Sequence, residues 1–384
     1  MIALPQDDRR TFPTERPVAG APARRPTGRP PPVYSGLPIE GLAMPQGTAQ
    51  DSSRKTVLSL VRATGQGHLG NYLGAYRQMA ELSARDDRTC FYGVADLHTL
   101  TTHPNPAEIR RYAPGIVLDI LASGVDPKRS ILFMQSTVPE TSELFWILSC
   151  LMPIGLLQRA VTFKDKSEKQ PENVNAGLLA YPVLMAADIL GPRAQLVPVG
   201  EDQYQHLEMA RELANKFNRM FCPDDPLFPE PQAVAKVPIR VPGLDGGGKM
   251  GKSEGNALYL SDGADAMWEK LRPAMTDPAR KRRQDPGTPE NCNIYTIHEY
   301  VSPPETLAWA AEGCRSASIG CVDCKKRLHG HLVDLLGPVQ ERRRELARDP
   351  SLVGDVLSDG TRRAREVIRE TVERAKDLVG IVWR

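Results

Sequence analysis

The sequence lacks a long apolar run, and this absence excludes one broad class of protein. No stretch of its 384 residues approaches the ~20 consecutive apolar residues that a membrane-spanning helix needs. The first residues also lack the apolar core of a secretory signal, so we expect a soluble, cytoplasmic protein with no membrane partner. Seven cysteines, an odd number, argue against a disulfide framework and leave metal or cluster ligation open.

The chain also lacks a strong excess of either charge. Lys and Arg number 49 and Asp and Glu 47, and this balance of +2 by itself speaks against a nucleic-acid partner. The balance differs by region, at +2 for residues 1–50, −3 for 51–270 and +3 for 271–384. The basic residues of the last region come in three runs, Arg280–Arg283, Lys325–Arg327 and Arg342–Arg344. Each run alone is typical of a solvated helix face, whereas three together favour a polyanion-binding surface.

Three kinds of segment follow one another along the chain. Residues 1–54 are rich in proline and show no apolar periodicity, so we expect a disordered extension. Residues 55–262 alternate short aliphatic runs with helical patterns, which predicts a Rossmann-like α/β domain with a doubly wound parallel sheet. Residues 263–384 follow a helical pattern throughout and predict a helical C-terminal domain.

Within the α/β region the aliphatic runs give four predicted strands: Thr56–Val61, Cys90–Ala95, Ile131–Met134 and Leu196–Val199. The helical patterns between and after them are Gly70–Leu82, Ile109–Leu121, Glu143–Leu151, Ile154–Phe163, Ala176–Leu190 and Gly200–Met220. Residues 223–248 are rich in proline and glycine and are expected to form a loop. In such a sheet ligands bind at the carboxyl ends of the strands.

Two motifs carry groups suited to binding phosphate. Gly67–Asn71, a glycine turn with His68, stands between the first strand and the first helix, where backbone N–H groups attract phosphate. Lys249–Ser253 lies far downstream on a glycine-flanked loop, and its two lysines three residues apart suit a polyphosphate that is gripped and then released. Either motif alone is equally typical of a tight connection or a surface loop.

Together the two motifs resemble the paired signatures of class I aminoacyl-tRNA synthetases. The residues between them are similar to those of the tryptophanyl-tRNA synthetases. The stretches that carry the similarity are Gly70–Ala75, Val94–His98, Tyr181–Leu190 and Val197–Gln203, followed by His206. The resemblance runs from about residue 55 to the C-terminus, with the N-terminal extension outside it.

The resemblance implies that tryptophan reacts with ATP to form an adenylate and pyrophosphate, and that the tRNA for tryptophan then receives the amino acid. His68 and Asn71 would contact the phosphates, and Lys249 and Lys252, with Ser253 and Mg²⁺, would stabilise charge on the leaving pyrophosphate. The positions that match the ATP site are Arg62, Thr64, Gly65, His68, Gly70, Asn71, Gly200, Asp202, Lys249, Met250 and Lys252. A homodimer is expected from the family alone.

The indole ring of tryptophan has one polar handle, an N–H donor, so its pocket needs a buried acceptor. Asp188 stands in an otherwise apolar helical stretch, where an aspartate that served only structure would be costly. The resemblance assigns Asp188 to the indole. It assigns the rest of the tryptophan site to His98, Tyr181, Met185, Val199 and Gln203. For His98, a satisfied core histidine is an equally good interpretation.

Two positions depart from the family pattern. Gly251 stands where the lysine signature commonly has serine, which predicts a looser loop. Ala63 stands where a proline is usual before the first signature. Neither change removes a charged catalytic group.

The cysteines fall into two groups. Cys90, Cys150 and Cys222 stand apart from one another and are expected to be structural thiols. Cys292, Cys314, Cys321 and Cys324 could ligate zinc or an iron–sulfur cluster, or stay unligated. Their spacing resembles that of the tryptophanyl-tRNA synthetases whose C-terminal domain binds a [4Fe–4S] cluster, which we favour over zinc. The basic runs Arg280–Arg283 and Lys325–Arg327 beside them are predicted to dock the anticodon stem.

Two other functions stay open on the sequence alone. One is a tyrosyl-tRNA synthetase, whose fold and signatures are related. The other is a catalytically weak synthetase-like protein that senses tryptophan or redox state without charging tRNA.

Overall fold

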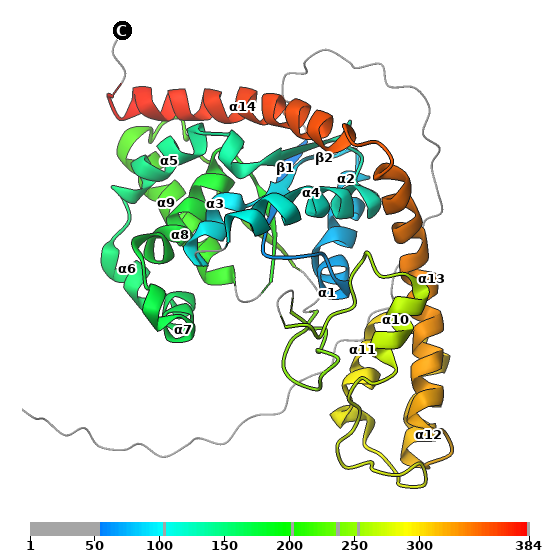
Figure 1. The fold of residues 1–384 in the computed structure, drawn as a ribbon. Helices are drawn as coiled ribbons and strands as arrows, with labels where there is room; N and C mark the ends of the chain where they lie inside the picture. Colours follow the sequence, from blue (N-terminus) through cyan, green and yellow to red (C-terminus); the bar gives the residue numbers. More distant parts are fainter. Residues whose placement is uncertain (1–53, 103–104, 201–202, 236–238, 252–253, 382–384) are drawn as a thin grey trace, which may run out of the picture. The chain divides into compact units, whose positions relative to one another are not determined.

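Five parallel strands form the centre of the described structure (Figure 1). The computed structural model describes residues 54–102, 105–200, 203–235, 239–251 and 254–381. The predicted N-terminal extension lies outside these residues except for its last member, Arg54. Three predicted site residues also lie outside them: Asp202, Lys252 and Ser253.

The strands form one sheet in the order β3-β2-β1-β4-β5, and all neighbouring strands are parallel. They are β1 (Lys55–Val61), β2 (Arg88–Val94), β3 (Ser130–Met134), β4 (Leu196–Val199) and β5 (Gln232–Ala235). The chain builds outward from β1 to one side and then returns to build the other, so the predicted doubly wound fold is confirmed. The strand order reverses between β1 and β4, where such folds bind their ligands.

Strand β5 shows that the loop expected over residues 223–248 was wrong at Gln232–Ala235. This strand has four residues, follows Pro231 and pairs only with β4 at the edge of the sheet. So short a run among prolines carries no recognisable strand pattern. Pairing with β4, rather than local preference, gives it its structure.

Nine helices connect the described strands or flank them. They are α1 (Leu69–Asn71), α2 (Arg77–Ser83), α3 (Asp96–Thr99), α4 (Pro106–Ala122), α5 (Glu140–Ser149), α6 (Ile154–Arg159), α7 (Val161–Lys169), α8 (Ala176–Leu190) and α9 (Tyr204–Phe221). A π-helical turn, Tyr72–Tyr76, joins α1 to α2. Helix α8 has the predicted bounds, whereas the helix predicted over 154–163 is broken at Ala160, whose backbone is extended.

Five more helices follow: α10 (Ala264–Leu271), α11 (Asn293–Val301), α12 (Pro304–Arg315), α13 (Cys321–Leu346) and α14 (Leu352–Leu378). The region is therefore largely helical, as predicted. The expectation of helix throughout was wrong for residues 272–288, which form turns. Pro273, Pro278 and Pro286 fall within this stretch, and proline removes the N–H group that a helix needs.

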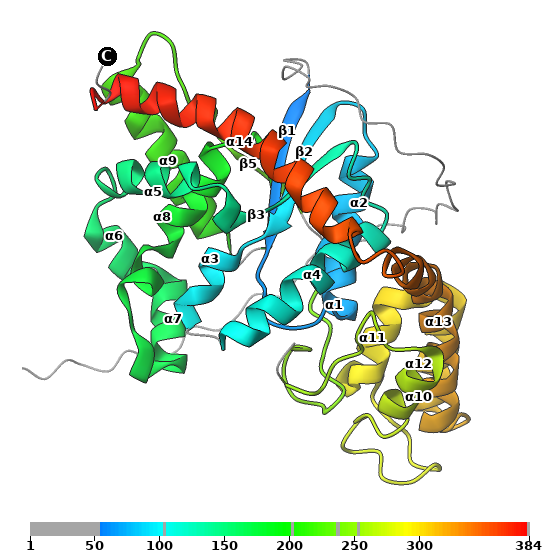
Figure 2. The same ribbon diagram turned by 45° about the horizontal axis from the view of Figure 1, so that its top comes forward.

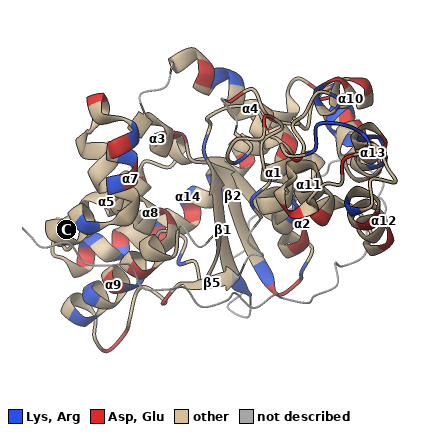
Figure 3. Cartoon of the chain, turned by 90° about the horizontal axis from the view of Figure 1, so that it is seen from below, with Lys and Arg blue, Asp and Glu red and all other residues tan. Residues whose placement is uncertain are grey.

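The sheet is buried on both faces. Neighbouring residues of β2 point to opposite sides, with Phe91 packed among α5, α8 and α9 and Tyr92 packed among α2 and α4. Strands buried on both faces need continuous apolar runs, which explains why these strands could be recognised in the sequence. Figure 3 shows that the charged residues lie mainly on the surrounding helices.

Helix α14 returns to the sheet and runs along it in both ribbon views (Figures 1 and 2). Its predicted apolar stripe, including Ala364, Ile368 and Val372, is buried in the same cluster as α5, α8 and α9. A Cβ atom on Gly360 would overlap the carbonyl oxygen of Leu132 in β3, so only glycine allows this approach. The helix thereby covers the β3 edge, which would otherwise offer unpaired backbone groups.

The domain boundary near residue 262 stays a prediction, and α10 begins close to it at Ala264. Among the described residues, no helix combines the length and apolarity required to cross a membrane.

Candidate active site

The predicted site residues gather where the strands end. Arg62 follows β1, His98 lies in α3 just beyond β2, and Gly200 follows β4. Parallel strands end at the same edge of the sheet, so these positions share one side of the molecule. Burial lowers the pKa of the Arg62 guanidinium from its ordinary value, and the guanidinium donates to Thr102 Oγ1 at 3.1 Å.

Asp188 is buried, with 7% of its surface exposed, although apolar residues surround it on α8. Its carboxylate accepts two hydrogen bonds from Gln135 Nε2, at 2.8 and 2.9 Å. His98 Nε2 lies 2.9 Å from its Oδ2 atom. These polar partners are what makes a buried carboxylate tolerable. They also hold the Asp188 carboxylate in one orientation, as a hydrogen-bond acceptor among the apolar side chains of α8.

Gln135 is a site residue that the sequence reasoning missed. It is fully buried, and its Oε1 atom also accepts a hydrogen bond from the backbone N–H of His98, at 3.3 Å. One signal could have found it. It is the first residue after the third predicted strand, at the carboxyl end where ligands bind.

Tyr181 and Gln203, which the resemblance assigns to the tryptophan site, are joined through His206. The Tyr181 hydroxyl lies 2.9 Å from His206 Nε2 and donates to Thr162 Oγ1 at 2.7 Å. His206 Nδ1 lies 2.9 Å from Gln203 Oε1. The His206 side chain is fully buried, so this network fixes the tyrosine and the glutamine relative to each other.

The aromatic rings connect this network to the Asp188 group. The Tyr181 ring meets the His98 ring edge-on with centroids 6.2 Å apart. Val199, at the end of β4, is buried, and Met185 is partly buried in the adjoining apolar cluster. The structure therefore brings His98, Tyr181, Asp188 and Gln203 into one connected set.

Lys166 is a second residue that the sequence reasoning missed. It belongs to α7, and its ammonium nitrogen lies 3.9 Å from the centre of the Tyr181 ring, within cation–π range. It brings a positive charge to the tyrosine side of the site. In the sequence it is one lysine of a mixed-charge helix, and nothing distinguishes it there.

The first signature forms a tight turn that begins α1. His68 Nδ1 accepts the backbone N–H of Gly70 at 3.1 Å, and Asn71 Oδ1 accepts the N–H of His68 at 3.2 Å. A neutral ring whose Nδ1 accepts a hydrogen bond carries its proton on Nε2. Nε2 is therefore the atom with which His68 would donate to phosphate.

The segment that follows the lysine signature pairs with this turn through its backbone. His68 pairs antiparallel with Tyr259, and Leu69 N donates to Leu258 O at 2.8 Å. Lys249 is exposed on the loop that follows Val241. The Met250 side chain is buried, and its N–H donates to the carbonyl of Val241. The two signatures, about 180 residues apart in sequence, thus share one backbone framework.

The two departures from the family pattern have local explanations. The N–H group of Ala63 donates to the buried Thr99 hydroxyl at 3.1 Å, a bond that proline could not make. At Gly251 a Cβ atom would lie 2.6 Å from the Cγ atom of Glu254, so serine there would require Glu254 to move. The N–H group of Gly251 donates to Asn256 Oδ1 at 3.0 Å, which ties the loop down at this point.

All four candidate cluster cysteines line one small cavity of about 20 Å³. Cys292 precedes α11, Cys314 lies near the end of α12, and Cys321 and Cys324 begin α13. Burial and the three neighbouring thiols raise the pKa of Cys324 to about 12. Among residues 54–381, apart from the short gaps named above, no group of three His, Cys, Asp or Glu side chains has an arrangement that could hold a metal ion.

Two basic side chains lie beside these thiols, contrary to the expectation that they face tRNA. Arg280 is buried, donates to carbonyls of Arg283 and Ile319, and lies 3.7 Å from Cys314 Sγ. Lys325 is also buried and donates to two backbone carbonyls at 2.8 and 2.6 Å. Burial lowers its pKa, and the nearby cysteines oppose that shift. The docking role predicted for these two residues was wrong.

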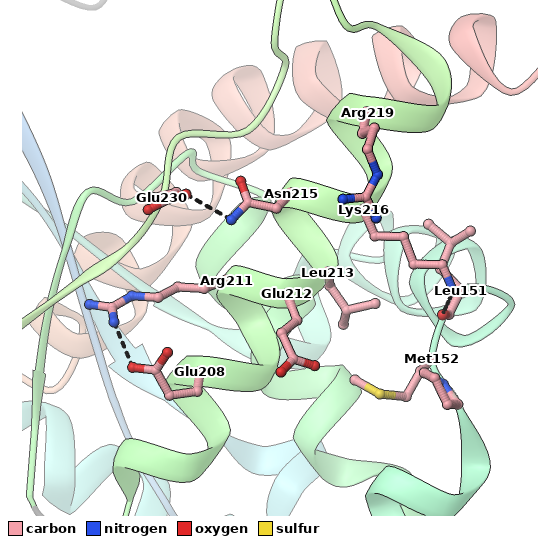
Figure 4. Close-up of a pocket in the computed structure, with 11 residues that line it drawn as sticks. Leu151, Met152, Glu208, Arg211, Glu212, Leu213, Asn215, Lys216, Arg219 and Glu230 are labelled. Atoms are coloured by element: carbon pink, nitrogen blue, oxygen red, sulfur yellow. Dashed lines mark hydrogen bonds and ion pairs between the residues drawn. The ribbon is translucent and has the colours of Figure 1, made fainter.

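A larger hollow of about 540 Å³ lies away from these groups, between α9 and the turn after α5 (Figure 4). Its polar walls are largely paired with each other. Arg211 bonds Glu208, Asn215 bonds Glu230, and Lys216 donates to the carbonyl of Leu151. None of the predicted site residues lines it, so it carries no part of the site.

Known proteins are similar to this chain in sequence and in fold. Residues 50–337 match the family "tRNA synthetases class I (W and Y)". The chain is 45% identical over 329 residues to the tryptophan–tRNA ligase of Deinococcus radiodurans, covering 85% of this chain and 98% of the relative. The corresponding ligase of Thermotoga maritima is 41% identical over 331 residues, with 85% and 99% covered.

Among solved structures, the Campylobacter jejuni tryptophanyl-tRNA synthetase, complexed with ADP and tryptophan, superposes with a TM-score of 0.72 at 31% identity. The match covers 85% of this chain and 99% of that one. The chain therefore belongs to the class I tRNA synthetases for tryptophan and tyrosine, and within them to the tryptophan–tRNA ligases.

Proposed function

We propose that this enzyme joins tryptophan to its tRNA in two steps. The tryptophan carboxylate attacks the α-phosphorus of ATP, forming tryptophanyl-adenylate as pyrophosphate leaves. The aminoacyl group then passes to the terminal ribose of the tRNA, releasing AMP. Neither step needs a nucleophile from the protein, so catalysis consists of positioning and charge stabilisation.

The observation that carries this proposal is the buried carboxylate of Asp188. Gln135 and His98 occupy part of its hydrogen-bonding capacity, and a carboxylate has further lone pairs that can accept an indole N–H. Tyrosine as a substrate would instead present a hydroxyl group. This group lies at a different position from the indole N–H, and it can both donate and accept a hydrogen bond. Tyr181 and Gln203, held by His206, would receive the α-amino group.

The ATP phosphates would lie at the first signature. His68 would donate from Nε2, since its Nδ1 atom accepts the backbone N–H of Gly70. Lys249 and Lys252 would neutralise charge on the departing pyrophosphate, and Mg²⁺ enters bound to ATP as part of the substrate. Arg62, Thr64, Gly65, Gly200 and Asp202 are proposed to hold the nucleotide.

Amino-acid-dependent exchange of pyrophosphate into ATP tests the first step, and charging of total tRNA tests the second. We expect exchange and charging with tryptophan and only background with tyrosine. Exchange with tyrosine would instead make the chain a tyrosine enzyme. Tryptophan-dependent exchange without charging would favour the sensor function.

We also propose that Cys292, Cys314, Cys321 and Cys324 ligate a [4Fe–4S] cluster. Support comes from the shared cavity and from Arg280 and Lys325. Four thiolates around iron carry net negative charge, and two buried cations beside them offset the cost of burying it. Such a cluster would supply a rigid cross-link between the helices that bear its ligands.

Iron and sulfide analysis of anaerobically purified protein tests the cluster. We expect both elements, and their loss in Cys324→Ser but not in Cys222→Ser, a control at a buried cysteine outside this group. Stoichiometric zinc without sulfide would identify a zinc site instead. Protein free of both metals would leave the cysteines as plain thiols.

The tRNA surface is proposed to include Lys326 and Arg327, which are exposed on α13. Arg327 also stacks over Trp309, with its guanidinium carbon 5.4 Å from the ring. Replacing both basic residues with alanine is expected to raise the KM for tRNA and flatten its salt dependence, with adenylate formation unchanged. An unchanged KM for tRNA would contradict this surface.

A homodimer is the last part of the proposal. Trp146, Ile154 and Val161, on α5, α6 and α7, are 68%, 63% and 60% exposed, and we propose that they contribute to the contact between the two copies. Sedimentation equilibrium of the wild type and of Trp146→Glu tests this. We expect a dimer that the charged variant weakens, whereas a monomeric wild type would refute it.

A further inference from the structure

The first-signature turn rests on a buried carboxylate that the reaction does not use. Asp119, on α4, is 3% exposed, and a Cβ atom at Gly67 would overlap its Oδ2 atom. Gly67 immediately precedes His68, so the carboxylate lies directly against the backbone that sets the position of the histidine. A side chain at residue 67 would displace either the turn or the aspartate.

Tyr76 closes the other side of this contact. Its ring carbon Cε2 would lie 3.3 Å from a Cβ atom at Gly67. The tyrosine is fully buried, and its hydroxyl has no hydrogen-bond partner among the described residues. Burial raises its pKa well above 10, and the charge of Asp119 adds to that shift. The turn is thus confined between a tyrosine ring and a carboxylate.

Asp119 is held in turn by an arginine from the far end of the chain. Arg343 Nε donates to Asp119 Oδ1 at 2.6 Å, across 224 residues of sequence. Arg343 belongs to the last turns of α13, the helix that begins with Cys321 and Cys324. Its side chain is 24% exposed and that of Asp119 only 4%, so the pair is shielded from solvent.

Helix α4 approaches α13 closely at this point. Gly115, one turn before Asp119, would place a Cβ atom 3.7 Å from Arg343 Nη2. A buried carboxylate that loses its arginine partner is left with an uncompensated charge, and it then moves or becomes protonated. A change in the position of Arg343 is therefore transmitted through Asp119 to the Gly67 backbone.

We propose that Asp119 and Arg343 are positioning residues that make the ATP-binding geometry of the Gly67–His68 turn depend on the position of α13. This inference rests on the function proposed above, in which His68 meets the phosphates. Since α13 also bears the exposed residues proposed for tRNA, the pair gives that helix a direct mechanical connection to the ATP site. The residues proposed for tryptophan lie on other helices, with His98 on α3 and Asp188 on α8.

The proposal separates the two substrates. In Arg343→Met the turn loses its fixed support, so we expect the KM for ATP to rise and kcat to fall, together about tenfold or more in kcat/KM for ATP. The KM for tryptophan should stay within about twofold, because Asp188 and Tyr181 do not contact the pair. Arg343→Lys keeps a cation that can reach Asp119 and should restore part of the loss.

The assay is pyrophosphate exchange without tRNA, with ATP and tryptophan varied in turn. Arg362→Met is the matched control, because Arg362 forms exposed ion pairs with Asp359 and Glu366 on α14. Asp119→Asn should reproduce the Arg343→Met effect, and the double variant should add little to either. Additive effects, or a KM for ATP that is unchanged in Arg343→Met, would overturn the proposal.

Two measurements keep the outcomes distinct. A variant that is only partly folded shows a lower kcat at an unchanged KM for both substrates. Thermal melting measures its loss of stability directly. This pattern would reject a positioning role. Failure of the wild-type enzyme to exchange pyrophosphate would reject the proposed function itself. An active wild type with an indifferent Arg343→Met variant rejects only the present inference.

Discussion

Replacing Asp188 with alanine tests the amino-acid pocket at its one buried carboxylate. The change removes the proposed indole acceptor together with the partner of Gln135 and His98. A hydrogen bond to a charged acceptor contributes about 1.5–3 kcal/mol, so the KM for tryptophan should rise roughly 10- to 150-fold. The KM for ATP should change little, because the first signature lies on other elements.

The same substitution has a second expected effect, on stability. The Gln135 amide stays buried after its acceptor is gone, and an unsatisfied buried group costs about 1–3 kcal/mol. Denaturant unfolding should show that loss. Asp188→Asn keeps one acceptor oxygen but turns an amide toward the Gln135 amide, so both effects should be intermediate.

Pyrophosphate exchange at saturating ATP, with tryptophan varied, measures the first effect. Asp359→Asn serves as the control, since Asp359 forms ion pairs with Arg362 and Arg363 on the surface of α14. If the KM for tryptophan in Asp188→Ala stays within about twofold of the wild type, the indole does not use this carboxylate. The function would then need a different acceptor.

Three further predictions concern other contacts. Gly360→Ala should lower the free energy of unfolding by about 1–3 kcal/mol, because its methyl group meets the Leu132 carbonyl; an unchanged denaturation midpoint would refute this. Burial would raise the pKa of Glu140, but hydrogen bonds from Arg365 and from its own backbone, together with the charges of Arg365 and Arg369, outweigh burial and hold that pKa below 4.5. The stability from this pair is therefore present above pH 4.5 and is lost as the pH falls through the lowered pKa. The denaturation midpoints of Arg365→Met and the wild type should differ at pH 7 and become equal in acid. Tyr181→Phe should raise the KM for tryptophan about tenfold in pyrophosphate exchange, and an unchanged KM would remove the hydroxyl from the site.

The sheet could be predicted from the sequence because its strands are buried on both faces. Continuous apolar runs such as Ile131–Met134 are distinctive, and glycine turns bound them. The edge strand Gln232–Ala235 could not be predicted, since its pairing with β4 is the main source of its order. Local sequence carries little information about such pairing.

Site residues could be predicted where a residue was unusual for its local sequence pattern. They could not be predicted where the site depends on contacts between segments that are distant in the sequence. Asp188 stands out as a carboxylate in an apolar helix. Gln135, which fixes it, is 53 positions away in the chain, and in the sequence it is marked only by its place directly after a predicted strand. His206 was visible only as part of a motif, although its buried ring joins Tyr181 to Gln203.

The basic runs show that more positive charge is counted in the sequence than is exposed on the surface to a polyanion. Each of the three runs contributes an inward member: Arg280 beside Cys314, Lys325 on two backbone carbonyls, and Arg343 on Asp119. Burial of these cations requires acceptors from distant segments, and a pattern of neighbouring residues cannot reveal them. Among the described members of these runs, Lys326 and Arg327 are exposed and belong to the proposed tRNA surface. The local excess of +3 over residues 271–384 therefore includes buried cations that join distant segments of the fold.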